Sequence, residues 1–425
     1  MRILFITPYP PSRIRVRSYG FLTQLRDAHE VTVVTQCASE REKLDAESLR
    51  KQGFEVIVVQ ESRRLAVLRS GLALFSTHPL QVAYARSKVL SKTVQQLCQQ
   101  RNFDVVHVEH LRGIASMETP ACTYPLVWDA VDCISLLTKH TIGAGHSLAV
   151  RTVARLEHNR TQRYEARMLH QLRHVVVTSA NDRRAMIELH RMPINDPMSN
   201  DGVSRTDIQV LPNGVDLDYF QPFQQERRRF NLVFSGKMSY HANVATALYL
   251  RQHIMPLIWQ RKPEATLTIV GSNPPKVIQA LASDPHVEVT GYVEDIRSYI
   301  GHAEVMLSPM VYSVGIQNKV LEAMALGTPV VVPVQVAAAL GAYPGRDLLV
   351  ATSAQEFAES ALQLMDDSEL RASLSRNGRA YVENQHDWRV LTGRLVDVYR
   401  RAINACNGEE MAVEIASSFV SGTAV

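Results

Sequence analysis

Short apolar runs recur along the chain, with helix-length stretches between them. The first series lies at residues 3–6, 31–34, 56–59, 105–108, 126–128 and 175–177, and the second at 232–234, 267–270, 287–289, 305–307, 330–332 and 348–350. Runs of this length that are rich in β-branched residues predict buried parallel strands in βαβ units. We therefore expect an α/β chain of two doubly wound, Rossmann-like domains that face each other across a cleft, with ligands at the strand ends.

The two series are separated by a polar, turn-rich segment at 192–206 that has no periodicity. We place the first domain at 1–205 and the second at 206–384. Residues 374–402 have a helical pattern, and a helix at about 385–405 is expected to pack back onto the first domain. Residues 407–425 carry small residues without a clear pattern and are interpreted as a frayed tail.

Composition narrows the class of protein. The chain has 425 residues, of which 46% are apolar, enough for two domains of roughly 200 residues each. A net charge of +4, from 46 basic and 42 acidic residues, gives no electrostatic case for nucleic acid. Five scattered cysteines without metal-site spacing argue for a reducing compartment and against a disulfide scaffold. The cysteines therefore favour the cytoplasm, and because no apolar run approaches the roughly 20 residues of a membrane-spanning helix, we expect a soluble protein.

The segment 315–329, GIQNKVLEAMALGTP, combines an anion-binding helix start with one acidic residue. Gly315 permits close approach of a ligand, and a helix that opens near Ile316 to Asn318 directs free N–H groups at a diphosphate. Glu322 lies in the same helix, where it can accept hydrogen bonds from a ribose diol. An ordinary helix packed on a strand, with Glu322 in solvent, fits the spacing equally well.

Several segments resemble the retaining glycosyltransferases of family 4, which have the two-domain GT-B fold, and the resemblance covers roughly residues 1–400. VLPNGVDLDYF at 210–220 is similar to the interdomain signature of that family, and 315–329 resembles its donor-site helix. TGYVED at 290–295 resembles its base-reading loop, and Gly271 ends the preceding strand. The resemblance implies transfer of a sugar from a nucleotide diphosphate sugar with retention of configuration.

A closer similarity points to one bacterial subgroup. It is carried by IRVRSY at 14–19, HPLQVAYARS at 78–87, WDAVDCIS at 128–135 and the GIQNK form of the helix start. These segments resemble the sugar transferases associated with exosortase-type exopolysaccharide systems. This similarity implies a role in exopolysaccharide or cell-surface glycan synthesis.

The chain departs from the family pattern at its charged positions. Val314 stands where the first of two glutamates is usual, so the contact to the donor sugar hydroxyls is in doubt. Gly236 and Lys237 keep a first cation, but Ala242 lies near the place of the second, and Lys319 could supply the missing charge. The usual histidine after the strand near residue 125 is absent.

The resemblance and the motifs together define a set of donor-site candidates: Gly236, Lys237, Gly271, Tyr292, Val293, Gly315, Ile316, Gln317, Asn318, Lys319 and Glu322. Lys237 follows a predicted strand, and its ammonium could neutralise charge on a departing diphosphate. The alternative is a surface lysine after a tight turn. Asp129, Asp132 and His110 are further catalytic candidates because a carboxylate or imidazole beyond a strand end can orient an acceptor hydroxyl, although a turn, a cap or a structural histidine is the alternative.

Two basic segments are candidates for the acceptor and the membrane. Arg13, Arg15 and Arg17 alternate after the first strand, where they could grip the phosphate of a polyprenyl diphosphate sugar, or simply form a solvated loop. The basic segment 151–173 could lie on an anionic membrane or form an exposed helix. Asp216, Leu217 and Asp218 resemble a metal-binding DxD, but they fall within the interdomain signature, and we expect no metal.

The sequence therefore predicts a hexosyltransferase-type glycosyltransferase without a cofactor. Its donor is a nucleotide diphosphate sugar, its acceptor a glycan or polyprenyl-linked molecule, and its expected contacts include the cytoplasmic face of the inner membrane but no nucleic acid. Two alternatives are a nucleotide-sugar 2-epimerase on the same fold and, because of Val314, a non-catalytic nucleotide-sugar-binding subunit.

Overall fold

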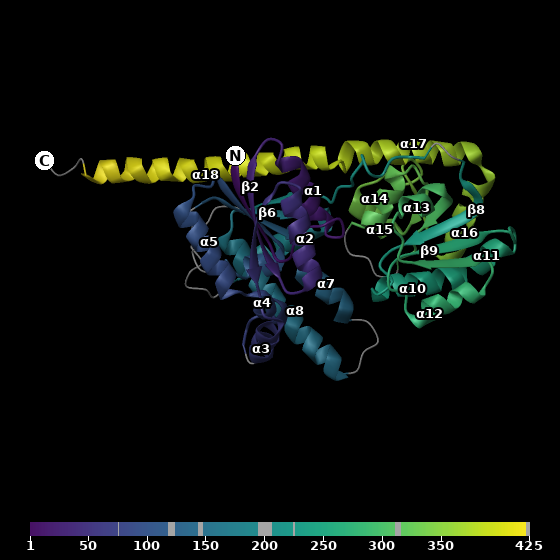
Figure 1. Ribbon diagram of the computed structural model, residues 1–425, viewed down its shortest axis with the longest axis horizontal. Helices are drawn as coiled ribbons and strands as arrows, with labels where there is room; N and C mark the ends of the chain where they lie inside the picture. The colour runs from purple at the N-terminus through teal and green to yellow at the C-terminus, as the bar shows by residue number, and fades with distance from the viewer. Residues whose placement is uncertain are drawn as a thin grey trace. The chain divides into compact units, whose positions relative to one another are not determined.

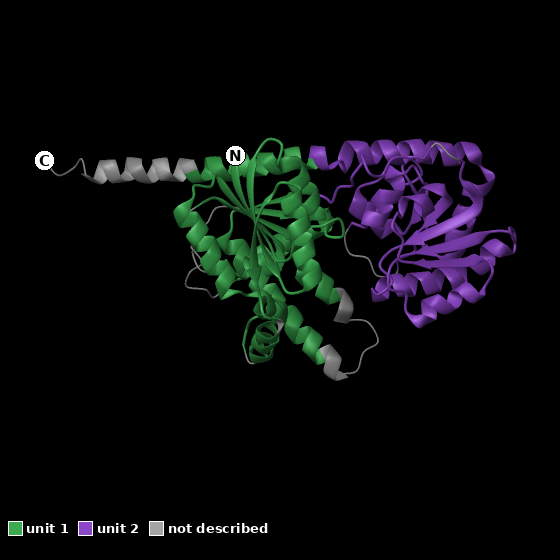
Figure 2. Ribbon diagram, in the orientation of Figure 1, with its two compact units in different colours: residues 1–211, 391–425 green, residues 212–390 purple. Residues whose placement is uncertain are grey.

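The chain divides into two compact units. The computed structural model describes residues 1–74, 76–117, 124–142, 148–193, 206–223, 226–310 and 316–421. Unit 1 comprises residues 1–211 and 391–425, and unit 2 comprises residues 212–390 (Figure 2). The first boundary lies later than the 205/206 that we expected because a strand at Asp207–Val210 still pairs with the sheet of unit 1.

Unit 1 is built on a sheet of parallel strands in the order β3-β2-β1-β4-β5-β6-β7. Their bounds are β1 Arg2–Thr7, β2 Glu30–Cys37, β3 Glu55–Gln60, β4 Val105–Glu109, β5 Leu126–Val131, β6 His174–Val177 and β7 Asp207–Val210. The first six coincide with the first series of apolar runs, which confirms that part of the prediction. The sequence analysis missed β7, an edge strand whose short run alternates with polar residues. The strand order reverses between β1 and β4.

Helices cover both faces of this sheet (Figure 1). Their bounds are α1 Val16–Leu25, α2 Glu40–Lys51, α3 Arg63–Ala73, α4 Leu80–Ala85, α5 Lys88–Gln100, α6 His110–Ile114, α7 Ile134–Ile142, α8 Leu148–Gln171 and α9 Ala180–His190. On one face, α5 buries Leu90, Val94 and Leu97 against the strands, at the spacing of an amphipathic helix. The opposite face carries Phe5 and His107, whose rings stack at 4.0 Å.

Unit 2 repeats the architecture with strands in the order β10-β9-β8-β11-β12-β13, all parallel. The strands are β8 Arg228–Ser235, β9 Thr266–Val270, β10 Val287–Gly291, β11 Ala303–Leu307, β12 Val330–Val332 and β13 Leu349–Val350. The helices are α10 His241–Tyr249, α11 Met255–Trp259, α12 Lys276–Gln279, α13 Arg297–His302, α14 Asn318–Ala325, α15 Val334–Leu340, α16 Ala354–Asp366 and α17 Ser368–Gln385, with a π turn at Leu250–Ile254 and a 3-10 turn at Ala280–Ser283. The predicted pair of doubly wound domains is confirmed.

Helix α18, Trp388–Ser421, begins in unit 2 and continues in unit 1. It follows α17 after a break at His386 and Asp387, and it buries Leu391, Leu395 and Tyr399 in unit 1. The helix is assigned through Ser421, and the interpretation of residues 407–425 as a frayed tail stays a prediction.

The cysteines are not all reduced. Cys37, Cys133 and Cys406 are free thiols, whereas Cys98 is disulfide-bonded. This bond weakens the argument from cysteine number for a reducing compartment. Within the described part of the chain, no helix combines the length and the apolar composition needed to cross a bilayer.

Candidate functional site

The loops after β8 and β9 in unit 2 approach each other through two glycines. A Cβ atom added to Gly271 would lie 1.7 Å from the carbonyl oxygen of Gly236, so no larger residue fits without moving the backbone. The loops are also joined by the Gly236 N–H, which donates to Val270 O at 3.0 Å. They lie beside the point where the strand order reverses, between β8 and β11, the usual ligand-binding position of an open parallel sheet.

Lys319 brings a cation to these loops. Its Nζ donates to Asn243 Oδ1 at 2.7 Å and lies 4.4 Å from the centroid of the Phe234 ring. The same Nζ would be 3.1 Å from a Cβ on Gly236, which places the ammonium directly beside the glycine loop. Asn243 in turn donates from Nδ2 to Lys237 O at 3.0 Å. One buried amide therefore ties the cation of α14 to the loop after β8.

The start of α14 lies at the same edge of the sheet. The helix begins at Asn318, and the first internal hydrogen bond is donated by Val320 N to Gln317 O at 3.0 Å. The N–H groups of Asn318 and Lys319 precede that bond and belong to the first turn, where the helix dipole favours an anion. Gln317 is held by Ser308 Oγ at 3.1 Å. The candidate Gly315, like Val314, lies outside the described residues.

Glu322 lies one turn after Lys319 and is half-buried. Burial raises the pKa of Glu322 to about 7, against the opposing charge of Lys319. Burial also lowers the pKa of Lys319 to about 7, and Glu322 only partly restores it. Both groups therefore change charge near neutral pH, a property that is common at functional sites.

The remaining donor-site candidates lie around these groups with different exposure. Lys237 is exposed at the end of β8, and Tyr292 is 75% exposed after β10. Val293 and Ile316 are half-buried and pack against the core of unit 2. The exposed ammonium of Lys237 and the enclosed one of Lys319 thus differ in how strongly water screens them.

Two of the candidates in unit 1 are enclosed rather than exposed. Arg17 is 5% exposed, and its Nε donates to Asp129 Oδ2 at 2.7 Å while Nη1 donates to Leu211 O at 3.0 Å. Asp129 is fully buried, with His107 Nε2 at 3.9 Å from Oδ2. The roles in acceptor binding and catalysis expected of Arg17 and Asp129 stay predictions, but Arg17 does not belong to a basic surface loop. The reason is that α1 begins at Val16 and turns the arginine onto the sheet.

Asp132 and His110 remain at the carboxyl edge of the sheet of unit 1. Asp132 is half-buried, and burial, with Asp182 nearby, raises its pKa to about 6. Burial lowers the pKa of His110 to about 4, so the imidazole is neutral. His110 and Val131 have positive φ angles of 65° and 67°, which are strained for residues other than glycine. Backbone strain of this kind is common at active sites and ligand-binding sites.

Unit 1 has a cavity of about 340 Å³ at the same edge. Arg15 lines it, with Nη2 donating to Glu42 at 2.7 Å and the guanidinium 4.0 Å from the centroid of the Tyr9 ring. Arg112 and Glu61 contribute further charges to its wall. Of the three arginines proposed for the acceptor, Arg15 alone lines this cavity, since Arg13 is exposed and Arg17 is buried elsewhere.

Sequence reasoning missed several groups of both sites. Asn243 was not proposed, although its place in the first turn of the helix after the Gly236 loop is a usable signal. The cavity residues Tyr9, Glu42, Glu61 and Arg112 come from four separate segments, so no local pattern joins them.

The interdomain segment has a structural explanation. A Cβ on Gly214 would lie 2.6 Å from the Trp388 ring, and Val215 N donates to His386 O at 2.8 Å. The segment therefore packs on the break between α17 and α18. Asp216 uses Oδ1 to accept from Asp218 N at 3.1 Å and Tyr219 N at 2.9 Å, so this carboxylate closes a turn.

Comparisons with known proteins identify the class of domain that unit 2 contains. Residues 229–367, which contain β9 to β13, α14 and all of β8 except its first residue, match the family described as glycosyl transferases group 1. The chain therefore carries a glycosyltransferase domain. This result confirms the predicted enzyme class at the level of the domain.

Two curated relatives are mannosyltransferases. One is the GDP-mannose-dependent monoacylated alpha-(1-6)-phosphatidylinositol monomannoside mannosyltransferase of Corynebacterium glutamicum, 28% identical over 217 residues that cover 46% of this chain and 56% of that protein. The other is the MMP alpha-(1->4)-mannosyltransferase of Mycolicibacterium hassiacum, 26% identical over 320 residues that cover 71% of each chain. The match thus spans little more than half of the corynebacterial relative.

Solved structures show the same two-domain fold. Alr3699/HepE of Anabaena in complex with UDP has a TM-score of 0.65 and 16% identity, with 94% of this chain and all of that chain covered. Sucrose-phosphate synthase of Thermosynechococcus elongatus has a TM-score of 0.67 and 15% identity, with 95% of this chain and all of that chain covered. At this identity the likeness shows the fold, and the predicted GT-B class is confirmed.

Proposed function

We propose that this chain is a glycosyltransferase that moves a hexose from a nucleotide diphosphate sugar held by unit 2 to an acceptor held by unit 1. The observation that carries the proposal is the cluster at the carboxyl ends of β8 and β9, where the Gly236 and Gly271 loops meet Lys319, one turn before Glu322 in α14. The glycines let the two loops pack closely at this edge, and Lys319 with the first turn of α14 supplies positive charge for a diphosphate there. Glu322 is the candidate acceptor of hydrogen bonds from the ribose.

Positive charge on this cluster supports a mechanism that works without a metal. The departing diphosphate gains charge in the transition state, and an enclosed ammonium and backbone N–H groups stabilise that charge without reorganising. Lys237, exposed on the adjacent loop, adds a second cation. Retention of configuration is part of the proposal through the resemblance to family 4, and so is a role in exopolysaccharide or cell-surface glycan synthesis.

The cavity of unit 1 is the candidate acceptor site. Its wall combines Arg15 and Arg112 with Glu42 and Glu61, so it offers both donors and acceptors to a phosphorylated or hydroxylated molecule. Asp132, at a neighbouring strand end with its pKa raised to about 6, is the candidate for orienting the acceptor hydroxyl. The curated relative from Corynebacterium, whose name describes a phosphatidylinositol monomannoside acceptor, supports a lipid-linked acceptor here.

The donor assignment is tested by thermal shift with UDP, GDP, ADP and their sugars. A ligand that binds only the folded state raises the apparent melting temperature. At a ligand concentration of 100 times Kd, the free energy of unfolding rises by about 2.7 kcal/mol. We expect one nucleotide family to shift the wild-type protein and the shift to be reduced by Glu322→Ala through loss of the ribose contact. Glu264→Ala, which removes a surface glutamate of unit 2, is the matched control. If none of these nucleotides shifts the melting temperature, the assignment of the donor site is wrong.

A lipid-linked acceptor places the enzyme at a membrane, and helix α3 is suited to that position. Exposed apolar side chains follow its length: Leu65, Val67, Leu68, Leu72 and, just after the helix, Leu74. The helix, RRLAVLRSGLA, has three arginines and no acidic residue. Arg160 Nη2 donates to Leu74 O at 2.9 Å and joins α3 to the basic helix α8, which exposes Val153 and Leu156. We include insertion of this apolar, basic surface into an anionic membrane in the proposed function.

Vesicle binding tests this surface. Leu68→Glu combined with Leu72→Glu replaces two apolar groups and adds two negative charges, so we expect partitioning onto vesicles of phosphatidylglycerol to fall more than about tenfold, because each buried leucine is worth about 1.5–3 kcal/mol. Leu44→Glu, at an equally exposed leucine of α2, is the control and should bind as the wild type does. Equal binding by the double variant and the control would exclude α3 as the membrane contact.

A further inference from the structure

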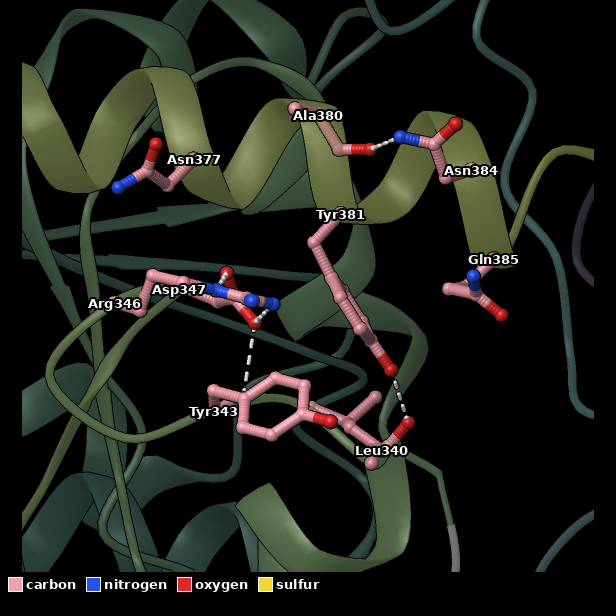
Figure 3. Close-up of a pocket in the computed structure, with 10 residues that line it drawn as sticks. Leu340, Tyr343, Arg346, Asp347, Asn377, Ala380, Tyr381, Asn384 and Gln385 are labelled. Atoms are coloured by element: carbon pink, nitrogen blue, oxygen red, sulfur yellow. Dashed lines mark hydrogen bonds and ion pairs between the residues drawn. The ribbon is translucent and has the colours of Figure 1, made fainter.

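Besides the cavity of unit 1, the structure has a cavity of about 900 Å³ in unit 2, which the proposed reaction does not use. It lies between α17 and the loop that joins α15 to β13 (Figure 3). Because α15 follows a parallel strand and ends at Leu340, and β13 begins only at Leu349, this loop belongs to the amino edge of the sheet. The cavity is therefore separated from the donor cluster at the carboxyl edge.

One face of α17 supplies planar polar side chains to the cavity. Asn377, Tyr381 and Asn384 are spaced by four and three residues, so they lie along one side of the helix. Asn384 Nδ2 donates to Ala380 O at 2.8 Å, which leaves its Oδ1 as an acceptor, and Tyr381 donates to Leu340 O at 2.6 Å. These bonds fix the side chains while leaving lone pairs on the amide and phenol oxygens.

The loop opposite supplies an aromatic platform. Tyr343 is 61% exposed, and the Arg346 guanidinium lies 4.2 Å from the centroid of its ring. Arg346 also forms a two-pronged pair with Asp347, at 2.8 and 2.9 Å, and Asp347 accepts from Tyr343 N at 2.9 Å. The loop is thus held together by its own contacts (Figure 3). With the guanidinium on one face of the Tyr343 ring, the other face is available for stacking.

The chemistry of the wall selects a class of ligand. Its one arginine is neutralised by Asp347, so the cavity has no excess positive charge to attract a phosphate. Amide and phenol groups would remain unpaired against an apolar ligand. Amides that donate and accept, next to an exposed tyrosine ring, suit a neutral molecule with hydroxyl groups on its edge and an apolar C–H face. A hexopyranose has this form.

We propose that this cavity is a second carbohydrate-binding site that holds a neutral oligosaccharide by stacking on Tyr343 and by hydrogen bonds to Asn377 and Asn384. Such a site retains a growing glycan or its product on the enzyme, away from the reacting centre. The inference rests on the proposed function only for the source of the glycan, since the recognition itself depends on the residues of the cavity.

The test is calorimetric titration of the full-length protein with short, neutral gluco-, galacto- and manno-oligosaccharides. We expect at least one of them to bind. Tyr343→Ala should weaken that binding by about tenfold, the loss of a stacking contact, whereas Tyr343→Phe keeps the ring and should bind as the wild type does. Asn377→Ala with Asn384→Ala should weaken it further.

The outcomes separate this site from the donor site. A normal thermal shift of Tyr343→Ala with the donor nucleotide shows that the variant is folded. Loss of oligosaccharide binding in that folded variant supports the proposal whether or not sugar transfer is observed. Binding that is unchanged in Tyr343→Ala and in the double asparagine variant would assign the oligosaccharide to another surface and overturn the proposal, as would the failure of every oligosaccharide to bind.

Discussion

Replacing Lys319 with alanine is expected to lower sugar transfer by about 100- to 1000-fold, the usual cost of removing one group that stabilises developing charge in an enclosed site. The ammonium lies beside the Gly236 loop and is oriented by Asn243 at 2.7 Å. Its loss should reduce turnover more than affinity for the donor, because the diphosphate gains charge as it leaves. Steady-state kinetics with the donor identified by thermal shift measures both effects.

The control is Lys262→Ala, which removes a lysine whose Nζ pairs with Asp366 at 2.7 Å and should leave turnover within about twofold. A pH series adds a second readout. With the pKa of Lys319 lowered to about 7, the ammonium is present at pH 6 and mostly lost at pH 8. Binding of a nucleotide sugar, whose phosphates do not titrate in this range, should therefore weaken from pH 6 to pH 8. Lys319→Arg should reduce that slope to the part caused by ionisation of Glu322, because a guanidinium stays charged. A flat wild-type profile would contradict the role given to Lys319.

Replacing Asp129 with alanine is expected to destabilise unit 1 by about 3–5 kcal/mol, the cost of removing one partner of a buried ion pair. Arg17 Nε donates to Asp129 at 2.7 Å, and both side chains are nearly inaccessible to water. In the variant the Arg17 guanidinium loses its carboxylate partner, and water cannot reach it to solvate the unpaired charge. Hydrogen exchange at the amides of β4 and β5 measures the change within unit 1, without assuming that the whole chain unfolds in one step.

Two further variants test whether the loss of stability comes from the buried ion pair. Asp397→Ala breaks the exposed pair with Arg400, at 3.0 Å, and should change stability by less than about 1 kcal/mol. The double variant Arg17→Met with Asp129→Leu buries no charge and should recover much of the loss. If Asp129→Ala were as stable as Asp397→Ala, the ion pair would have no structural role, and a direct role for Asp129 in the reaction would have to be considered again.

The fold was largely predictable because each central strand is a short, mostly apolar run. Runs such as 31–34 and 267–270 are buried on both faces of the sheet, and helix-length segments between such runs favour parallel strands covered by two layers of helices. The exception is β7, an edge strand that needs less apolar surface. Because the sequence analysis did not predict this strand, the predicted domain boundary was placed too early.

The sites were predictable only where one segment supplies the chemistry. Lys319 and Glu322 belong to a single motif, and the glycines follow recognisable strands. Arg17 could not be separated from Arg13 and Arg15, because alternating arginines look alike until the start of α1 turns the third one inward. The cavity of unit 1 and the carbohydrate cavity of unit 2 are assembled from distant segments by the fold itself, so no spacing along the chain reveals them.

The path of α18 has a consequence for how the protein is made. Tyr399 donates its hydroxyl to, or accepts from, His107 Nδ1 at 2.9 Å, and Leu391 and Leu395 are fully buried in the same unit. During synthesis on the ribosome these partners emerge only after all of unit 2 has been translated. The first 211 residues must therefore wait with one apolar surface uncovered, and nascent chains arrested before residue 391 should be captured by chaperones that recognise exposed hydrophobic segments.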